Sequence, residues 1–134
     1  MAYRDPKNFF DRELSWLAFN RRVLKEAQDK STPLIDRLKF LGIVANNMDE
    51  FFMVRVSGVQ EQIISNVRVT SQAGYTPAMQ FALIHQEAHK QFELMYRCYR
   101  NEILPALEQN KLSIVSTKAL SSKVKKNLRE KFEK

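Results

Sequence analysis

Glycine and proline are scarce in this sequence, and their scarcity restricts the possible folds more than any other feature. Only 3 glycines and 4 prolines occur in 134 residues, which leaves little material for the many tight turns of a β-sandwich or β-barrel. Long stretches of good helix formers separate them. An apolar fraction of 44% is sufficient for a hydrophobic core. We therefore predict an all-α fold, a helical bundle that contains one long helix.

Helical periodicity predicts the first two helices over residues 15–29 and 33–41. The N-cap of the first helix is assigned to Ser15, with Asp11 as an earlier alternative, because both side chains accept hydrogen bonds from free backbone N–H groups. The second helix follows a Thr-Pro pair, which is typical of an N-cap and first helical position. Gly42 is expected either to stop this helix or to mark a close approach of the backbone to a neighbour.

One face of the first predicted helix is apolar, with a single polar residue within it. Asn20 is that exception to the apolar spacing. Trp16 and Phe19 lie on the same face and are interpreted as core residues rather than as a stacking surface for a ligand. The first helix is therefore expected to pack into the bundle through its aromatic side chains.

The segment 43–50 is interpreted as a junction between helices. Its paired asparagines, Asn46 and Asn47, compete with the helical backbone for hydrogen bonds and favour caps. The two acidic residues after Met48 suit the first turn of a third helix, which is expected to end near Asn66. From the residues alone, capping outweighs a specific polar contact, although an amide also suits the edge of a purine.

Thr76 and Pro77 repeat the pattern of a cap followed by proline and open the longest predicted helix. Apolar residues keep helical spacing for roughly 28 residues, which corresponds to about 40 Å of helix. Pro105 should bend or end this helix, because proline lacks the backbone donor and clashes with the preceding turn. A helix of this length is expected to brace a neighbouring domain.

The last part of the chain is predicted to differ from the rest. Residues 112–115 are interpreted as a short extended piece, and Ser121 or Ser122 caps a final helix that runs to the end of the sequence. We therefore divide the chain into a helical domain over residues 1–110 and, over 111–134, a linker with the start of a second domain.

The net charge of +7 is unevenly distributed. Residues 118–134 carry seven basic and two acidic side chains, whereas the remaining 117 residues carry 15 basic and 13 acidic ones. The body of the chain is therefore close to neutral, and nucleic acid is not expected as a partner. The single cysteine, Cys98, is interpreted as a buried thiol. It fits a reducing cytoplasm, as does the lack of any signal-peptide or membrane-spanning pattern.

No pattern of residues provides a complete active site. His85 and His89 are four residues apart and share a helix face, but no third metal ligand accompanies them, and we predict no metal site. Three dispersed glycines exclude a glycine-rich phosphate-binding loop. We also predict no catalytic residue, since no nucleophile is paired with a base.

Several blocks of the sequence resemble the N-terminal region of the bacterial-type polyphosphate kinases. The blocks are RELSWLAFNRRVL at 12–24, TPLIDRLKFLGI at 32–43, NNMDEFFMVRV at 46–56 and NEILPAL at 101–107. They occur in the family's order and spacing, and the resemblance extends over residues 8–134. It is less distinctive between residues 65 and 90.

The resemblance implies a phosphotransferase. Members of the family transfer the terminal phosphate of ATP reversibly to inorganic polyphosphate through a phosphohistidine. They contain an N-terminal helical domain, a head domain and two C-terminal domains, and they form homo-oligomers. The phosphorylated histidine lies in the C-terminal part, and neither His85 nor His89 matches it. The isolated fragment is therefore expected to be inactive. The parent enzyme is expected to be cytoplasmic or associated with a membrane.

The resemblance also changes the interpretation of Asn47. The asparagine that contacts ATP in the family matches Asn47, so this residue is expected to bind ATP, while the downstream domains would hold Mg²⁺, the phosphates and the nucleophile. An alternative is a protein-interaction or dimerisation module that docks through the long helix and the region of Phe51 and Phe52. A third possibility is that the basic tail, residues 118–134, binds polyphosphate or nucleic acid.

Overall fold

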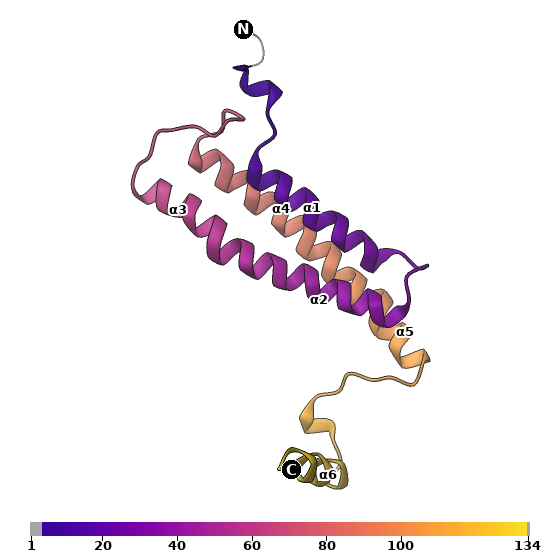
Figure 1. Ribbon diagram of the computed structural model, residues 1–134. Helices are drawn as coiled ribbons and strands as arrows, with labels where there is room; N and C mark the ends of the chain where they lie inside the picture. The colour runs from indigo at the N-terminus through magenta and orange to yellow at the C-terminus, as the bar shows by residue number, and fades with distance from the viewer. Residues whose placement is uncertain (1–3, 134) are drawn as a thin grey trace.

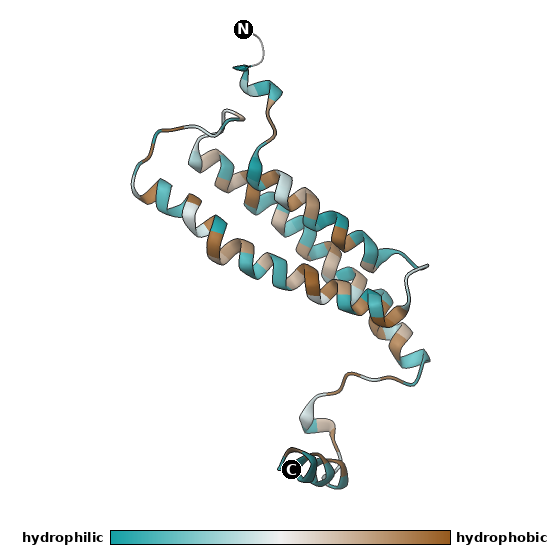
Figure 2. Ribbon diagram, in the orientation of Figure 1, coloured by the Kyte–Doolittle hydropathy of each residue, from teal (hydrophilic) through white to brown (hydrophobic). Residues whose placement is uncertain are grey.

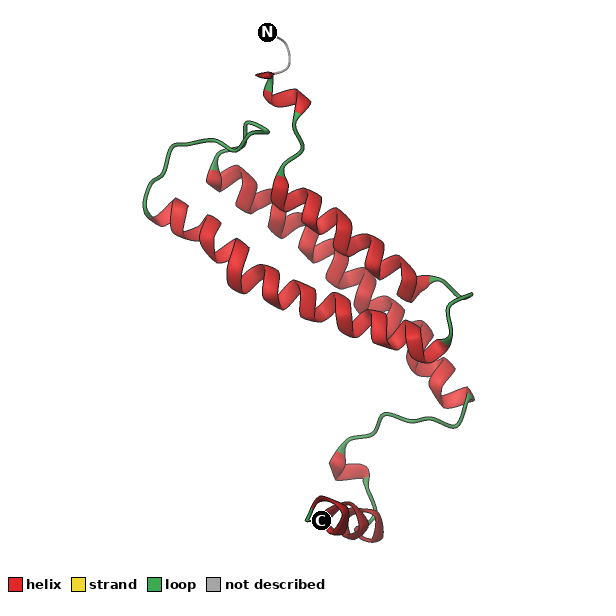
Figure 3. Ribbon diagram, in the orientation of Figure 1, coloured by secondary structure: helices red, strands yellow, loops and turns green. Residues whose placement is uncertain are grey.

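The computed structural model describes residues 4–133, and within them every regular element is helical and no strand occurs, as Figure 3 shows. The prediction of an all-α bundle is therefore confirmed. The main helices are α1 (Arg12–Gln28), α2 (Leu34–Glu50), α3 (Ser57–Ile64), α4 (Pro77–Cys98), α5 (Leu104–Gln109) and α6 (Ser122–Phe132). Two π-helical segments, η3 (Phe51–Val56) and η4 (Tyr99–Ile103), and two short 3₁₀ turns, η2 (Pro6–Asn8) and η5 (Thr117–Ala119), also lie within the described part of the chain.

Three long rods form the bundle (Figure 1). The first rod is α1, the second runs without a break through α2, η3 and α3, and the third runs through α4, η4 and α5. The first rod packs against both others, and α3 packs against α4. Apolar residues recur along each rod in Figure 2. Helix α6 lies apart from the rods, beyond an extended connection that leaves α5.

The hydrophobic core consists of two adjoining clusters along the axis of the bundle. The cluster nearest the α1–α2 turn is made of Leu24, Ala27, Leu41, Val44, Met95, Cys98, Ile103 and Leu107. The other is made of Leu17, Met48, Phe51, Val56, Val59, Ile84 and Ala88. Phe92 packs against both, so the two clusters form one continuous core.

Each π turn coincides with an irregular step in the buried stripe of its rod. In the second rod the buried apolar residues are Leu41, Val44, Met48, Phe51, Val56 and Val59. In the third rod, beyond Pro77 in its first turn, the buried residues are Ile84, Ala88, Gln91, Met95, Cys98, Ile103 and Leu107. The steps are three or four residues, except for five-residue steps from Phe51 to Val56 and from Cys98 to Ile103. Since a π turn accommodates one extra residue, it keeps the later residues on the buried face.

The start of the first helix follows the alternative prediction. Helix α1 begins at Arg12, and the side chain of Asp11 accepts hydrogen bonds from the backbone N–H groups of Glu13 and Leu14. The assignment of the N-cap to Ser15 is therefore wrong. A carboxylate at this position also interacts favourably with the positive end of the helix dipole, which a serine hydroxyl does less strongly.

The predicted junction at 43–50 is wrong, because α2 continues through this segment into η3 and α3. Gly42 lies within α2 and does not end it. Asp49 and Glu50 lie at the end of α2 in the middle of the rod, so they cap no helix. The rod ends two residues before Asn66, whose φ of 52° is the left-handed conformation common after a helix, close to the predicted end.

The boundaries of the later helices agree in part with the predictions. Thr76 caps α4 by accepting a hydrogen bond from Met79 N–H, as predicted. Pro105 does not end the helix, as one of the two predicted outcomes had it, because it falls in the first turn of α5, directly after a π turn. Residues 112–115 form no regular element. Ser121 caps α6 as predicted. The helix ends at Phe132, so the predicted continuation stops short at Glu133, and Lys134 lies outside the described residues.

The second helix also differs at its start. Pro33 is the N-cap of α2 rather than its first residue, and no side chain caps this end. Arg37, in the second turn, provides the polar contacts here instead. Its Nε donates to the carbonyl oxygen of Ala27 at 2.7 Å, and its Nη2 donates to Glu102 Oε2 at 2.7 Å. The 7% exposed Arg37 thereby joins the end of α1, α2 and η4.

Cys98 is a buried thiol, as predicted. Its Sγ lies 3.6 Å from the carbonyl oxygen of Ala27, and the residue is 1% exposed. Burial raises the pKa of the Cys98 thiol; the nearby Glu102 carboxylate raises it further, and Arg37 opposes the shift. The reactive thiolate is therefore disfavoured in the folded protein.

We expect Cys98 to react with iodoacetamide at pH 8 at least about tenfold more slowly in the native protein than in urea, because the thiol is covered and its pKa is raised. Because its pKa is raised, the Cys98 thiol stabilises the folded state fully at pH values below the pKa of the unfolded thiol. That contribution is lost as pH rises above this value, because only the unfolded thiol then ionises. The measurement is labelling followed by mass spectrometry. Equal labelling rates in the two states would contradict a buried thiol.

Candidate functional site

Two asparagine side chains meet between α1 and α2. Asn20, on α1, is fully buried, and Asn47, on α2, is partly buried. The Nδ2 group of Asn47 donates to Asn20 Oδ1 at 3.0 Å, and Asn20 Nδ2 donates to the carbonyl oxygen of Val44 at 3.4 Å. Asn46, the other member of the pair in the sequence, is exposed. Of the two adjacent asparagines, only Asn47 is therefore held in a defined orientation by a distant side chain.

A cavity of about 290 Å³ opens beside Asn47. Its lining residues are Trp16, Phe19, Asn47, Glu50, Phe51, Val54 and Arg55. Phe51 is buried beneath Trp16, and the two rings stack with centroids 4.2 Å apart and planes 3° from parallel. The cavity thus combines aromatic surface with one amide, one guanidinium and the carboxylate of Glu50. Its volume lies near the lower end of the range for small-molecule sites, so it suits a flat ring rather than a whole nucleotide.

The aromatic residues of α1 differ in their environment. Trp16 is partly buried on Phe51, in agreement with its interpretation as a core residue. Phe19 is 47% exposed, so the prediction that it packs in the core is wrong. Phe19 lies at the rim of the cavity instead, where the guanidinium of Arg22 lies 6.0 Å from its ring centroid. An exposed aromatic ring beside an amide is available for stacking on a ligand.

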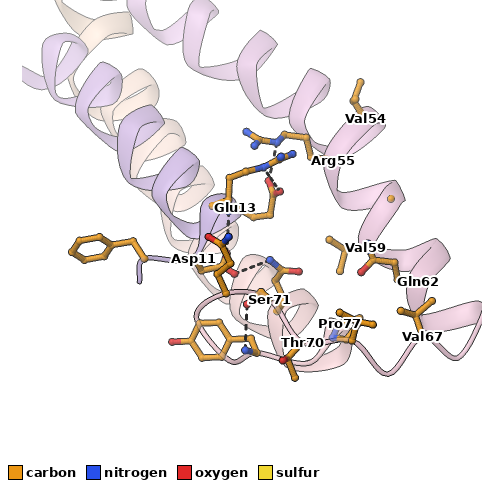
Figure 4. A pocket seen from close by; sticks show the side chains of 17 residues that line it. Asp11, Glu13, Val54, Arg55, Val59, Gln62, Val67, Thr70, Ser71 and Pro77 are labelled. Atoms are coloured by element: carbon orange, nitrogen blue, oxygen red, sulfur yellow. Dashed lines mark hydrogen bonds and ion pairs between the residues drawn. The ribbon is translucent and has the colours of Figure 1, made fainter. Parts of the chain in front are cut away.

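Arg55 lies between this cavity and a larger one. Its Nε lies 2.8 Å from Glu13 Oε2, and the Glu13 side chain is 10% exposed. The contact is an ion pair rather than an aligned hydrogen bond, since Oε2 accepts no hydrogen bond of good geometry among the described residues. Glu13 Oε1 also accepts from Arg12 Nε at 3.2 Å. Figure 4 shows Glu13 and Arg55 directed toward one another.

The larger cavity, of about 830 Å³, is bounded by α1, α3 and the connection before α4 (Figure 4). Asp11 contributes to its wall and accepts a hydrogen bond from Gln80 Nε2 at 2.8 Å, which ties the start of α1 to α4. The connection folds back on itself through Ser71, whose backbone N–H donates to the carbonyl oxygen of Tyr75 at 2.8 Å. These hydrogen bonds hold the start of α1 and the connection in place as walls of the cavity.

His85 and His89 lie on α4 with their ring centroids 6.2 Å apart. His85 also packs edge-on against Phe52, at 5.7 Å, and lies 4.4 Å from the ring of Phe81. Over residues 4–133 no group of three or more His, Cys, Asp or Glu side chains is arranged to hold a metal ion. In the same part of the chain, no helix is both long and apolar enough to cross a membrane.

Asn20 and Arg55 contribute to this site but were not identified from the sequence. Asn20 had a detectable signal, since it is the one polar residue in an otherwise apolar stripe, and such a residue needs a hydrogen-bond partner when buried. Arg55 had none, because nothing in the sequence places it opposite Glu13. The pairing crosses from η3 to α1 and depends on the packing of the two rods.

Comparison with known proteins gives a consistent result. The model of the polyphosphate kinase N-terminal domain family matches residues 9–115. A polyphosphate kinase of Halalkalibacterium halodurans is 42% identical over 130 residues, which are 96% of this chain and 18% of that protein. A polyphosphate kinase of Bacillus anthracis is 41% identical over 130 residues, again 96% of this chain and 18% of that protein.

A solved structure agrees with these sequence matches. The crystal structure of polyphosphate kinase from Porphyromonas gingivalis superimposes with a TM-score of 0.68 at 34% identity, and the match covers 94% of this chain and 17% of that one. The chain thus spans less than a fifth of the length of the relatives it matches.

Proposed function

This chain belongs to the polyphosphate kinase N-terminal domain family, and from that membership we propose that it forms the adenine end of the ATP site in a polyphosphate kinase. The whole enzyme would transfer the terminal phosphate of ATP reversibly to inorganic polyphosphate. The observation that supports this function most directly is the position of Asn47, whose amide borders a cavity with aromatic walls. Stacking and one amide contact are the usual means of holding a purine base.

The proposal assigns different tasks to this domain and to the rest of the enzyme. The cavity beside Asn47 has room for a base but not for a triphosphate. Among residues 4–133 no group of three or more His, Cys, Asp or Glu side chains could hold a metal ion by itself, so Mg²⁺ would be held together with the phosphates outside this cavity. The phosphates, the metal ion and the phosphorylated histidine would therefore belong to the head and C-terminal domains, and the isolated chain would be inactive. Assembly into a homo-oligomer would also be a property of the whole enzyme.

Replacing Asn47 with alanine tests the proposed function. We expect the KM for ATP of the full-length protein that contains residues 1–134 to rise by up to about tenfold, because one neutral hydrogen bond contributes about 0.5–1.5 kcal/mol. Polyphosphate formation would be measured over a range of ATP concentrations. Asn46→Ala is a matched control, since the neighbouring amide is exposed. Unchanged ATP kinetics together with a lower melting temperature would leave Asn47 a purely structural role.

The alternative of an interaction module would use the long helix and the region of Phe51 and Phe52. Phe51 is 1% exposed and Phe52 is partly buried against aromatic neighbours, so these two rings contribute little surface. The exposed apolar side chains of that region are Met53 (71% exposed) and Val54 (66%). Sedimentation equilibrium of the 134-residue chain addresses this function, and a monomer at all concentrations would contradict autonomous association.

A further inference from the structure

Asn20 occupies a position at which both ends of its amide are constrained. The residue is 0% exposed and lies in the buried face of α1. Its Nδ2 faces the carbonyl oxygen of Val44 at 3.4 Å, and its Oδ1 faces Asn47 Nδ2 at 3.0 Å. A buried polar group of this kind is costly unless both ends are paired, and here they are.

The partners of Asn20 determine which way its amide points. A backbone carbonyl only accepts hydrogen bonds, so the NH₂ end of Asn20 must face Val44, and a reversed amide would bring two oxygens together. The oxygen of Asn20 then faces Asn47, which must present its own NH₂ group in return. One N–H of Asn47 is thereby used, and the residue is left with its oxygen and its second N–H for the cavity that it borders.

We propose that Asn20 is a positioning residue that fixes the orientation of the Asn47 amide, and that this orientation selects a 6-amino purine over a 6-oxo purine. The inference rests on the proposed function, since it requires a base in the cavity beside Asn47. Adenine has an amino donor at C6 next to ring-nitrogen acceptors, and it matches an amide that offers an oxygen and an N–H side by side. Hypoxanthine and guanine have a carbonyl oxygen at C6, which would face the oxygen of Asn47.

The test compares ATP with ITP, which differ at the C6 substituent of the base, in the full-length protein that contains residues 1–134. We expect Asn20→Leu and Asn20→Ala to lower the ratio of kcat/KM for ATP to kcat/KM for ITP by about tenfold, the scale of a bidentate amide contact. In both variants the Asn47 amide has lost its partner and is free to rotate, which exchanges the positions of its oxygen and its NH₂ group. Asn20→Ala only removes atoms, so it introduces no steric clash if the leucine variant folds poorly.

Asn20→Asp is the conservative variant that separates orientation from stability. An aspartate oxygen still accepts from Asn47, whether the carboxyl group is ionised or protonated, so the ATP preference should remain near that of the unmodified protein. The same variant should melt earlier, because burying a carboxylate is costly. If Asn20 had a purely structural role, the ratio of kcat/KM for ATP to kcat/KM for ITP would instead fall in step with the melting temperature in all three variants, including Asn20→Asp.

The two proposals fail in different ways. If Asn47→Ala raises the KM for ATP but the ATP/ITP ratio is unchanged in folded Asn20→Leu and Asn20→Ala, the positioning role is overturned and the proposed function stands. If Asn47→Ala leaves ATP kinetics unchanged, the proposed function is overturned, and the positioning role with it. A loss of selectivity in Asn20→Asp equal to that in Asn20→Leu would also overturn the orientation argument.

Discussion

Replacing Phe51 with alanine is expected to lower the free energy of unfolding by about 3–5 kcal/mol, the usual range for removing a buried phenylalanine. The side chain is 1% exposed, stacks on Trp16 at 4.2 Å between ring centroids and meets Phe52 edge-on at 5.9 Å. The substitution would leave a cavity at the first π turn that the rigid rods on either side cannot close. Urea unfolding followed by the fluorescence of the single tryptophan, Trp16, measures the change.

Phe10 provides the matched control for this substitution. It is 92% exposed, so Phe10→Ala should change the free energy of unfolding by less than about 0.5 kcal/mol. The Phe51→Ala substitution also alters the candidate site, because Phe51 supports the ring of Trp16 in the wall of the cavity beside Asn47. A loss of less than about 1 kcal/mol for Phe51→Ala would contradict the aromatic stack as a component of the core.

Replacing Arg37 with alanine is expected to lower the free energy of unfolding by about 2–4 kcal/mol. Breaking a buried ion pair generally costs about 3–5 kcal/mol, and the cost is smaller here because the side chain of Glu102 is 38% exposed and regains water. The variant also leaves the carbonyl oxygen of Ala27 without the Nε donor. Thermal and urea unfolding of the 134-residue chain measure the effect.

Lys39 gives a matched control on the same helix. It pairs with Asp36 at 3.0 Å, but the two side chains are 70% and 47% exposed. Lys39→Ala should therefore change stability by less than about 0.5 kcal/mol, as is usual for an exposed pair. Equal effects of Arg37→Ala and Lys39→Ala would show that burial does not strengthen the contacts of Arg37.

The helical class could be predicted from the sequence because it depends on local properties. The scarcity of glycine and proline and the cap at Thr76 act through residues close in sequence, and both predictions are confirmed. The junction at 43–50 was wrong for the opposite reason. Asn47 favours a cap only while its side chain lacks another partner, and in the structure that partner is Asn20, 27 residues away.

The same distinction applies to the candidate site. The identity of Asn47 came from the family resemblance, and its role in binding ATP stays a prediction. Its surroundings could not be predicted, because they depend on how the rods pack. Arginines are rarely buried, so periodicity gave no reason to place Arg37 inside the bundle. Helical spacing placed Phe19 on the same face as Trp16, but that face is wider than the contact between α1 and its neighbours.

The two π turns have a consequence for how this domain can change length. Removing one exposed residue from η3, such as Met53, would shorten the step between Phe51 and Val56 from five residues to four. An ordinary α-helix accommodates a four-residue step, so the same side chains would still enter the core. A deletion elsewhere in the rod would turn every later residue by about 100° and expose the stripe. Related sequences are therefore expected to differ by single-residue gaps at these two turns, inside helices where gaps are otherwise poorly tolerated.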